Sequence, residues 1–419
     1  MYLINNREGK EMKNISIIFC LIIMATSEIS PFIFDSTSSI EIDSGYIKVE
    51  GGYLFYEEAG TGENIVLLHD GLIDRQVWDD QFLFLAKDYR VIRYDRLGYG
   101  KSSNPKSSYS NVDNLYQLFE QLNIDKAIIF GMSAGGGVSI DFTLRHPKKV
   151  SGLILVGAVV SGYGYSTHMF TRGGNLDPSL SPNNNLKKFI TYFATEDPYE
   201  IYYKNITAKE KALKLIVADS LAWVTRHQFY VPPDRPAAKF LLEIKVPVLI
   251  LVGEYDIPDV QAHAGIIEFG IPNAKREIVP NSGHLIPLEQ PEYFNAKVLK
   301  FLNGQEFFNI LTSQGVNAAV EYFSQRRKSE PDIILFDERE LNFLGYKFLQ
   351  DRKLNDAIEL FKLNTITYPE SWNTYDSLGE AYLKNGQNEL AIENYKRSLE
   401  LNPNNTNALE ILKTINNTK

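Results

Sequence analysis

Residues 126–136 read KAIIFGMSAGG and are the stretch of the chain that is most informative about its fold. The apolar run from Ala127 to Phe130 predicts a buried strand, and a helical pattern begins directly after the glycines. Between them, Gly131, Ser133 and Gly135 make a G-x-S-x-G sequence, which in this context is typical of a strained turn that exposes a serine hydroxyl. We expect glycine on both sides because strand and helix backbones come too close there for a Cβ atom. The alternative is a glycine-rich turn without chemistry.

An acid and a histidine follow downstream, in the order that such a serine needs. Residues 246–252 (VPVLILV) predict a buried parallel strand, and Asp256 lies just beyond its carboxyl end. Residues 276–279 predict the next strand, and His284 lies in the loop after it. Ligands of open α/β sheets bind at the carboxyl ends of the strands, so we expect Ser133, Asp256 and His284 to meet there.

Two further segments complete a resemblance to the α/β-hydrolase fold family. An apolar strand, residues 65–68, runs into the turn HDGL at 69–72, where the family usually has His-Gly. Residues 91–102 are similar to the family's D-x-R-G-x-G-x-S segment, with Arg96 and the following residue in swapped order, and we expect Arg96 to shape this loop. The resemblance covers about residues 45–303 and implies an α/β fold with a mostly parallel sheet.

The resemblance also implies an oxyanion hole. By that alignment, the backbone N–H groups of Gly71 and Ala134 are the two donors. Asp70 stands where the family usually has glycine, and we expect its carboxylate to point away from the oxyanion. His69 is expected to brace the turn through hydrogen bonds.

These parts imply acyl transfer through a covalent acyl-enzyme. His284 would take the proton of Ser133 and return it to the leaving group, while Asp256 would hold the imidazole tautomer. Asp259 is the alternative acid, although it begins a helical pattern and looks like a cap. A serine at the centre of the G-x-S-x-G turn argues against the dehalogenase and epoxide-hydrolase branches of the family, which carry aspartate there.

The remaining histidines have simpler interpretations. We expect His263 to be a packing or surface residue and His146 to cap a helix. His168 and His227 lie in an insertion and are candidates for substrate contact. The 6 histidines and 1 cysteine show no metal-ligand spacing, so no metal and no cofactor are expected.

The insertion, about residues 158–240, is too long for an ordinary connection, and in this family it would be a cap over the site. Helices are expected over 186–195, 198–204 and 208–226, with many aromatic residues that could line a pocket for a small, moderately apolar acyl substrate. The bond cleaved would be an ester, a thioester or an amide.

Two alternatives to an esterase remain. An aminopeptidase of the same fold would need a cap carboxylate to hold an ammonium group. The candidates are Glu196, Asp197, Glu200 and Asp219. The alternative from another class is a protein-binding scaffold whose hydrolase domain is inactive or secondary. An intact serine, acid and histidine set disfavours it.

The C-terminal part repeats at a period of 34 residues, because residues 338–371 align with 372–405. The matching pairs are Gly345 and Gly379, Ala357 and Ala391, Phe361 and Tyr395, and Pro369 and Pro403. This resembles the tetratricopeptide repeat, which implies a peptide or protein partner; the alternative is a dimerising or stabilising appendage. Ala319 and Phe323 suggest an earlier degenerate unit, and residues 406–418 suggest a capping helix.

The N-terminus predicts export. An apolar run from Ile15 to Ala25 follows two lysines and precedes small residues, which is typical of a secretory signal cleaved near Ser27; an uncleaved membrane anchor is the alternative. We therefore expect a signal peptide over 1–27 and a periplasmic or extracellular protein. A linker over 28–44, a hydrolase-like domain over 45–305 and a repeat domain over 306–419 would follow.

Composition agrees with two globular domains. The chain has 419 residues and is 44% hydrophobic, which is enough for substantial cores. Its formal net charge of −9 argues against nucleic acid or an anionic membrane as a partner.

Overall fold

The computed structural model describes most of the chain from residue 40 onward. The described residues are 40–331 and 333–417, apart from 172–183, 185–187, 189–190, 193–195, 202–203 and 219–228. We call residues 42–290 the sheet domain and residues 316–417 the repeat domain; helix α10 (Pro291–Gln314) joins them. The predicted signal peptide lies outside the described residues, and none of the described helices is both long and apolar enough to cross a membrane.

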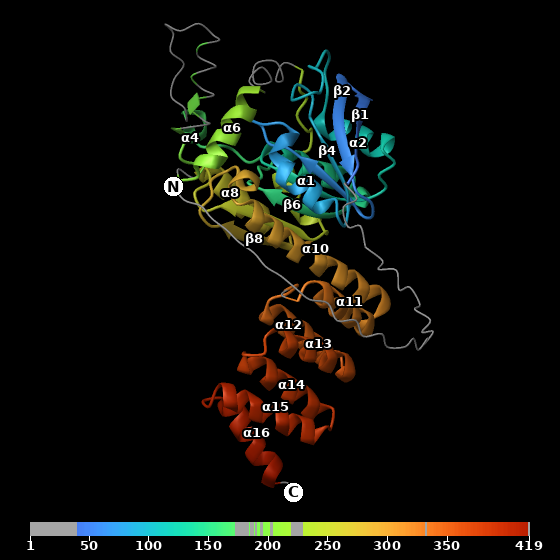
Figure 1. Cartoon of the computed structure of the whole chain (residues 1–419), viewed down its shortest axis with the longest axis vertical. Coiled ribbons are helices and arrows are strands. Elements are labelled where there is room, and N and C mark those ends of the chain that lie inside the picture. Colours follow the sequence, from blue (N-terminus) through green and yellow to red (C-terminus); the bar gives the residue numbers. More distant parts are fainter. Residues whose placement is uncertain are drawn as a thin grey trace, which may run out of the picture. The chain divides into compact units, whose positions relative to one another are not determined.

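A β-sheet forms the centre of the sheet domain (Figure 1). It has eight strands in the order β1-β2-β4-β3-β5-β6-β7-β8. The strands are β1 (Ile42–Val49), β2 (Gly52–Ala59), β3 (Asn64–Leu68), β4 (Arg90–Tyr94), β5 (Ala127–Met132), β6 (Val150–Val156), β7 (Val248–Gly253) and β8 (Ala274–Val279). β1 and β2 pair antiparallel, and β3 to β8 are parallel. The mostly parallel sheet predicted from the apolar runs is confirmed.

Helices cover both faces of this sheet, as strands that are apolar on both sides require. Along β3, Val66 and Leu68 face one core, and Ile65 and Leu67 face the other. The first core includes side chains of α2 (Asn111–Gln121), α3 (Ala134–Arg145) and α8 (Pro258–Gly270), and the second those of α1 (Asp79–Leu85) and α10. The short helices are η1 (Arg75–Trp78), η2 (Pro147–Lys149), η5 (Ala237–Lys239), η6 (Leu241–Glu243) and α9 (Ile286–Glu289).

The insertion between β6 and β7 contains α4 (Thr167–Thr171) and α6 (Ile206–Ala218) among its described residues. The helix expected over 198–204 is not formed in its described part, where 198–200 is a turn. A carboxylate oxygen of Asp197 accepts the N–H of Tyr199 at 2.8 Å, which favours a turn over a helix. The helix expected over 208–226 begins earlier, at Ile206, and most of the one expected over 186–195 lies outside the described residues.

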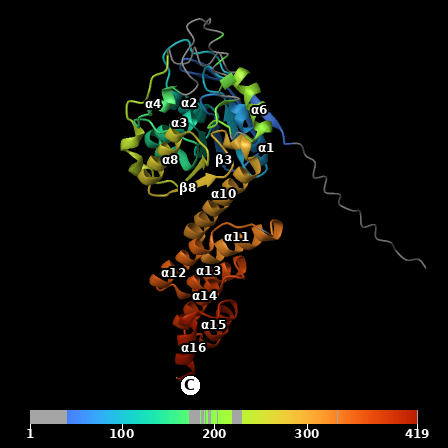
Figure 2. The same ribbon diagram turned by 90° about the vertical axis from the view of Figure 1, so that its left-hand side faces the viewer.

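The repeat domain consists of helices that follow one another in chain order (Figure 2). They are α11 (Val316–Ser329), α12 (Glu338–Gln350), α13 (Leu354–Thr367), α14 (Trp372–Lys384), α15 (Asn388–Leu401) and α16 (Thr406–Asn417). A Cβ atom on Gly345 would lie 2.6 Å from the ring of Phe361, and one on Gly379 would lie 3.2 Å from the ring of Tyr395. The same glycine–aromatic contact therefore recurs in both repeats, at the predicted period.

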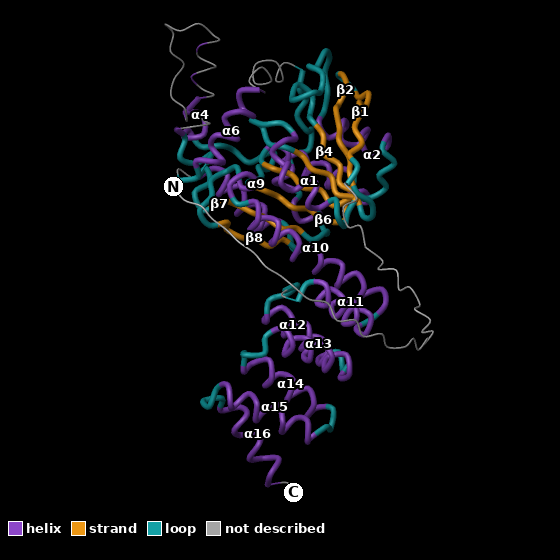
Figure 3. Tube along the Cα trace, in the orientation of Figure 1, coloured by secondary structure: helices purple, strands orange, loops and turns teal. Residues whose placement is uncertain are grey.

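Helix α10 contributes to two cores. Its first half packs Phe294, Val298 and Leu302 into the sheet domain, and its second half packs Phe307 and Leu311 with the repeat helices. The boundary expected between 305 and 306 falls inside this helix. In the degenerate unit that the sequence suggests, α11 would be the second helix and the end of α10 the first. The repeat domain is made of helices and loops (Figure 3).

Candidate active site

Ser133 occupies a strained turn at the carboxyl end of β5. Its backbone has φ 50° and ψ −115°, in a region that residues with a Cβ atom rarely adopt. Such a conformation costs about 1–3 kcal/mol and persists only where the surroundings hold it. Here the N–H of Ser133 donates to the carbonyl of Val156 at 2.9 Å, and its carbonyl accepts from the N–H of Gly137 at 3.1 Å. The serine is thus fixed between the end of β6 and the first turn of α3.

The flanking glycines allow the close approach that the motif predicts. A Cβ atom on Gly131 would lie 2.6 Å from the Cα of Gly136, in the helix that follows the turn. One on Gly135 would lie 2.4 Å from the carbonyl oxygen of His69, at the end of β3. Both contacts are with backbone atoms, so the turn and the loop after β3 pack together only because these positions lack side chains.

Asp256 and His284 form a buried pair at the ends of β7 and β8. The distance from Nδ1 of His284 to Oδ1 of Asp256 is 2.9 Å. A Cβ atom on Gly157, where φ is 49°, would lie 2.9 Å from Nδ1 of His284 and 3.0 Å from Oδ2 of Asp256. The end of β6 therefore packs directly against the pair, and the pair leaves Nε2 of the imidazole as the atom that can take a proton.

The charges around His284 favour its protonated form. Burial alone would lower the pKa of His284, but the charge and hydrogen bond of Asp256, with smaller contributions from Glu200 and Asp70, raise the pKa to about 9. The backbone N–H of His284 also donates to the carbonyls of Tyr199 and Glu200, each at 2.9 Å. The insertion thus holds the histidine loop through backbone hydrogen bonds.

The alternative acid, Asp259, has a different partner. Its carboxylate accepts both the backbone N–H and the hydroxyl of Ser166, the latter at 2.8 Å. Burial opposes ionisation of Asp259, but these two hydrogen bonds hold its pKa below the usual range. Asp259 therefore anchors the start of the insertion, and Asp256 is the acid that contacts His284.

The other histidines lie apart from the Asp256–His284 pair or in the insertion. Nδ1 of His263 accepts the N–H of Val160 at 3.0 Å, so this buried ring is a packing residue. His146 stacks on Tyr116 at the end of α3, with ring centroids 4.5 Å apart. His168, in α4, is partly exposed, with its Nδ1 3.9 Å from Oδ2 of Asp259. His227 lies outside the described residues.

The turn after β3 uses the carboxylate of Asp70 internally. Oδ1 of Asp70 accepts the N–H of Leu72 at 3.0 Å and that of Ile73 at 2.7 Å. Burial raises the pKa of Asp70, and these hydrogen bonds oppose that rise. One carboxylate oxygen is therefore committed to the turn that contains Gly71.

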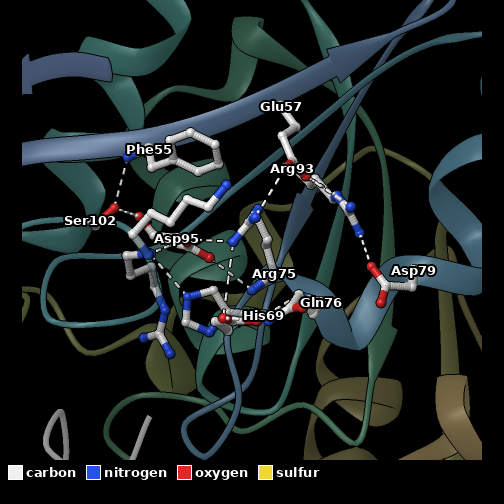
Figure 4. A network of polar contacts seen from close by, with 12 residues as sticks. Phe55, Glu57, His69, Arg75, Gln76, Asp79, Arg93, Asp95 and Ser102 are labelled. Carbon is white, nitrogen blue, oxygen red and sulfur yellow. Dashed lines mark hydrogen bonds and ion pairs between the residues drawn. The ribbon is translucent and has the colours of Figure 1, made fainter. Parts of the chain in front are cut away.

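A buried ionic network links β2, η1 and the end of β4 near this turn (Figure 4). Nη1 of Arg75 lies 2.9 Å from Asp95, its Nη2 lies 3.0 Å from Glu57, and Glu57 in turn pairs with Arg93 at 2.8 Å. Burial raises the pKa of Asp95 to about 6, although the charge of Arg75 opposes that rise. Sequence reasoning did not single out Glu57 or Arg75. A buried charge needs a partner, but the sheet register decides which residues meet.

Two of the four candidate cap carboxylates are buried. Asp197 and Glu200 are buried, Glu196 is exposed, and Asp219 lies outside the described residues. Among the described residues, no three histidine, cysteine or acidic side chains gather as a metal site would require.

Comparison with known proteins identifies both parts of the chain. Residues 64–196 match the model of the alpha/beta hydrolase fold, and residues 377–405 match that of the tetratricopeptide repeat. A 2-hydroxy-6-oxononadienedioate/2-hydroxy-6-oxononatrienedioate hydrolase of Paraburkholderia phymatum is 31% identical over 285 residues, which cover 62% of this chain and 95% of that protein.

Esterases are among the other similar proteins. The carboxylesterase YbfK of Bacillus subtilis is 24% identical over 280 residues, which cover 63% of this chain and 89% of that protein. The structure of a thermophilic esterase from Thermogutta terrifontis superimposes with a TM-score of 0.52 at 22% identity, covering 63% of this chain and 99% of the esterase. The latter likeness concerns the fold alone.

Proposed function

Since the chain belongs to the α/β-hydrolase fold family and carries tetratricopeptide repeats at its C-terminus, we propose that it is a serine hydrolase that cleaves a small, moderately apolar ester, thioester or amide. The observation that carries this proposal is the strained backbone of Ser133 at the same sheet edge as the Asp256–His284 pair. A strained non-glycine residue is retained where its conformation serves a function.

The reaction follows from the roles of these groups. Oγ of Ser133 attacks the substrate carbonyl carbon while Nε2 of His284 takes the hydroxyl proton. Asp256, at Nδ1, stabilises the imidazolium that forms. The N–H groups of Gly71 and Ala134 stabilise the oxyanion, and loss of one such donor costs about 2.7–4 kcal/mol. The leaving group departs with the proton from His284, and water then hydrolyses the acyl-enzyme by the same steps.

An aminopeptidase is the second candidate. Glu200 is buried, and its charge contributes to the raised pKa of His284, so it lies where it would also attract a substrate ammonium group. An absolute requirement for a free α-amine would select this candidate over an esterase. Equal hydrolysis of p-nitrophenyl esters with and without an α-amino group would select the esterase.

The repeats and the N-terminus extend the proposal. The repeat domain would bind a peptide or protein partner, and residues 1–27 would direct export to the periplasm or beyond. Sequencing the N-terminus of the protein recovered from its native compartment tests the second point, because cleavage near Ser27 is the expected result.

Labelling with a fluorophosphonate tests the central proposal. The wild type should be labelled, and Ser133→Ala should abolish labelling and turnover while the far-UV spectrum stays unchanged. Ser139→Ala is the matched control, since Ser139 is a buried serine of α3 whose hydroxyl donates to the carbonyl of Gly135 at 2.8 Å. It should still be labelled. A folded wild type that is not labelled, or a Ser133→Ala variant that keeps full turnover, would contradict the mechanism.

A further inference from the structure

The carbonyl oxygen of Asp70 accepts hydrogen bonds from two side chains. Nδ1 of His69 lies 2.8 Å from it, and Nη2 of Arg96 contacts it as well. The backbone N–H of Arg96 donates to Nε2 of His69 at 3.0 Å, so Nε2 is an acceptor. We therefore assign the proton of this imidazole to Nδ1, from where it is donated to the carbonyl.

That carbonyl belongs to the same peptide unit as the N–H of Gly71. The C=O and N–H of a trans peptide point in opposite directions, so holding the oxygen on one side directs the N–H to the other. The next peptide unit is held as well, because the hydroxyl of Tyr99 donates to the carbonyl of Gly71 at 3.0 Å and the N–H of Leu72 donates to Asp70. The direction of the Gly71 N–H is thus fixed by the hydrogen bonds that the carbonyls of Asp70 and Gly71 accept from side chains.

Arg96 is a buried cation whose polar contact is with this carbonyl. Its side chain makes no ion pair within 4 Å among the described residues, and its Nε is buried there without a hydrogen-bond partner. The guanidinium lies 4.9 Å from the ring centroid of Tyr99. Desolvation of a guanidinium is unfavourable, and a charged donor makes a stronger hydrogen bond than a neutral one. A cation that donates a hydrogen bond to the oxygen of a peptide polarises that peptide and strengthens its N–H as a donor.

We propose that Arg96 is a positioning residue of the oxyanion hole, which directs and polarises the N–H of Gly71 through the carbonyl of Asp70. The inference rests on the proposed function, in which this N–H receives the developing oxyanion. Because the oxyanion forms only after attack, Arg96 stabilises the transition state and contributes little to substrate binding.

The test compares Arg96→Met and Arg96→Lys with the wild type in steady-state hydrolysis of a p-nitrophenyl ester. Loss of a whole oxyanion donor lowers kcat by about 10²–10³, so a misdirected donor should lower it by about 10–100-fold in Arg96→Met. KM should change by less than about twofold, because the lost interaction exists only in the transition state. Affinity for a trifluoromethyl ketone, whose carbonyl oxygen becomes an oxyanion when the serine adds to the carbonyl carbon, should fall by the same factor as kcat. Arg96→Lys should recover part of both losses, since an ammonium can still donate to the carbonyl.

Arg93→Met is the matched control. Arg93 is also a buried arginine, within β4 and three residues before Arg96, but it pairs with Glu57 and Asp79 and not with the turn. It should lower the thermal midpoint while kcat and inhibitor affinity stay within about threefold of the wild type.

Two results would overturn the inference. One is an Arg96→Met enzyme whose kcat and ketone affinity match those of Arg93→Met. The other applies if Arg96→Met fails to fold. It is an Arg96→Lys enzyme whose kcat/KM falls only because KM rises, while kcat equals that of the wild type. A wild type without fluorophosphonate labelling would instead refute the proposed function itself, so the two failures are distinguishable.

Discussion

Glycines lie at close contacts in both the candidate active site and the repeats, but the atoms that approach them differ in kind. At the turn that holds Ser133, Gly135 lies against the carbonyl of His69, which directly follows β3 and cannot move without disturbing the end of that strand. In the repeats, Gly345 and Gly379 lie against aromatic rings of the next helix along the chain. A ring can rotate or shift by a few tenths of an ångström. The site therefore depends on single long-range backbone contacts, whereas the repeats use one local contact twice.

This difference indicates where the protein should tolerate substitutions. Each functional group of the site is held by a partner that is distant in sequence, as Asp256 holds His284 and Val156 holds Ser133. No second copy of these contacts exists among the described residues to compensate for a loss. A repeat helix packs against similar helices on both sides, so the loss of one contact leaves the contacts with the other neighbour in place.

The largest expected effect is that of Asp256→Asn. Without the carboxylate, His284 loses the partner that fixes its tautomer, and the rate of hydrolysis should fall by about 10⁴-fold. Asp259→Asn is the control and should change the rate by less than about tenfold, because Asp259 pairs with Ser166. Steady-state kinetics of the two variants decide. The reverse order of effects would make Asp259 the acid.

The pH profile sharpens the same point. His284 must be neutral to act as a base, and its pKa is about 9, so kcat/KM should rise with pH up to about 9. In Asp256→Asn the charge that raises this pKa is gone, and the rise of kcat/KM with pH should occur at lower pH. The stability that the charged pair contributes is present below the ordinary pKa of 6.5 and is lost as pH rises through about 9. An apparent pKa near 6.5 in the kcat/KM profile of the wild type would contradict this assignment.

Paired glycine substitutions test the comparison itself. In Gly135→Ala the Cβ atom would lie 2.4 Å from a backbone oxygen, and we expect a loss of about 3 kcal/mol or more in the free energy of unfolding. In Gly379→Ala the contact is 3.2 Å from a ring, and a gain in helix propensity of about 1 kcal/mol offsets the strain. Its net change should stay within about 1 kcal/mol. Urea unfolding of both variants, monitored by circular dichroism, provides the measurement, and equal losses would refute the distinction.

Removal of the repeats should have the smallest effect on the site. A chain that ends at Gly315 keeps α10 whole, with Phe294, Val298 and Leu302 in the sheet domain, and should keep fluorophosphonate labelling within about twofold of the full chain. The matched control ends at Gln290 and removes these three buried side chains, and truncation of Phe294 alone would cost about 3–5 kcal/mol, so this chain should not fold. Loss of labelling in a folded chain ending at Gly315 would show that the repeats help to build the site.

The sequence predicted much of the fold and only part of the site. The strands β3, β5 and β7 follow from uninterrupted apolar runs, which are typical of strands buried on both faces. The period of 34 follows from matching small and large residues. The expected helix over 198–204 was wrong in its described part, where Asp197 stabilises a turn. Helical propensity in that stretch was overridden by a local side-chain hydrogen bond.

The strained turn at Ser133 and the repeat period could be predicted from the sequence, because each depends on residues that are close together in the chain. Tertiary structure alone decided that His284 contacts Asp256 and not Asp259, that one helix contributes to two cores, and that Arg96 and His69 hold the carbonyl of Asp70. These contacts join segments from different strands and loops. Their partners depend on sheet register and loop dihedral angles, to which no local pattern of residues corresponds.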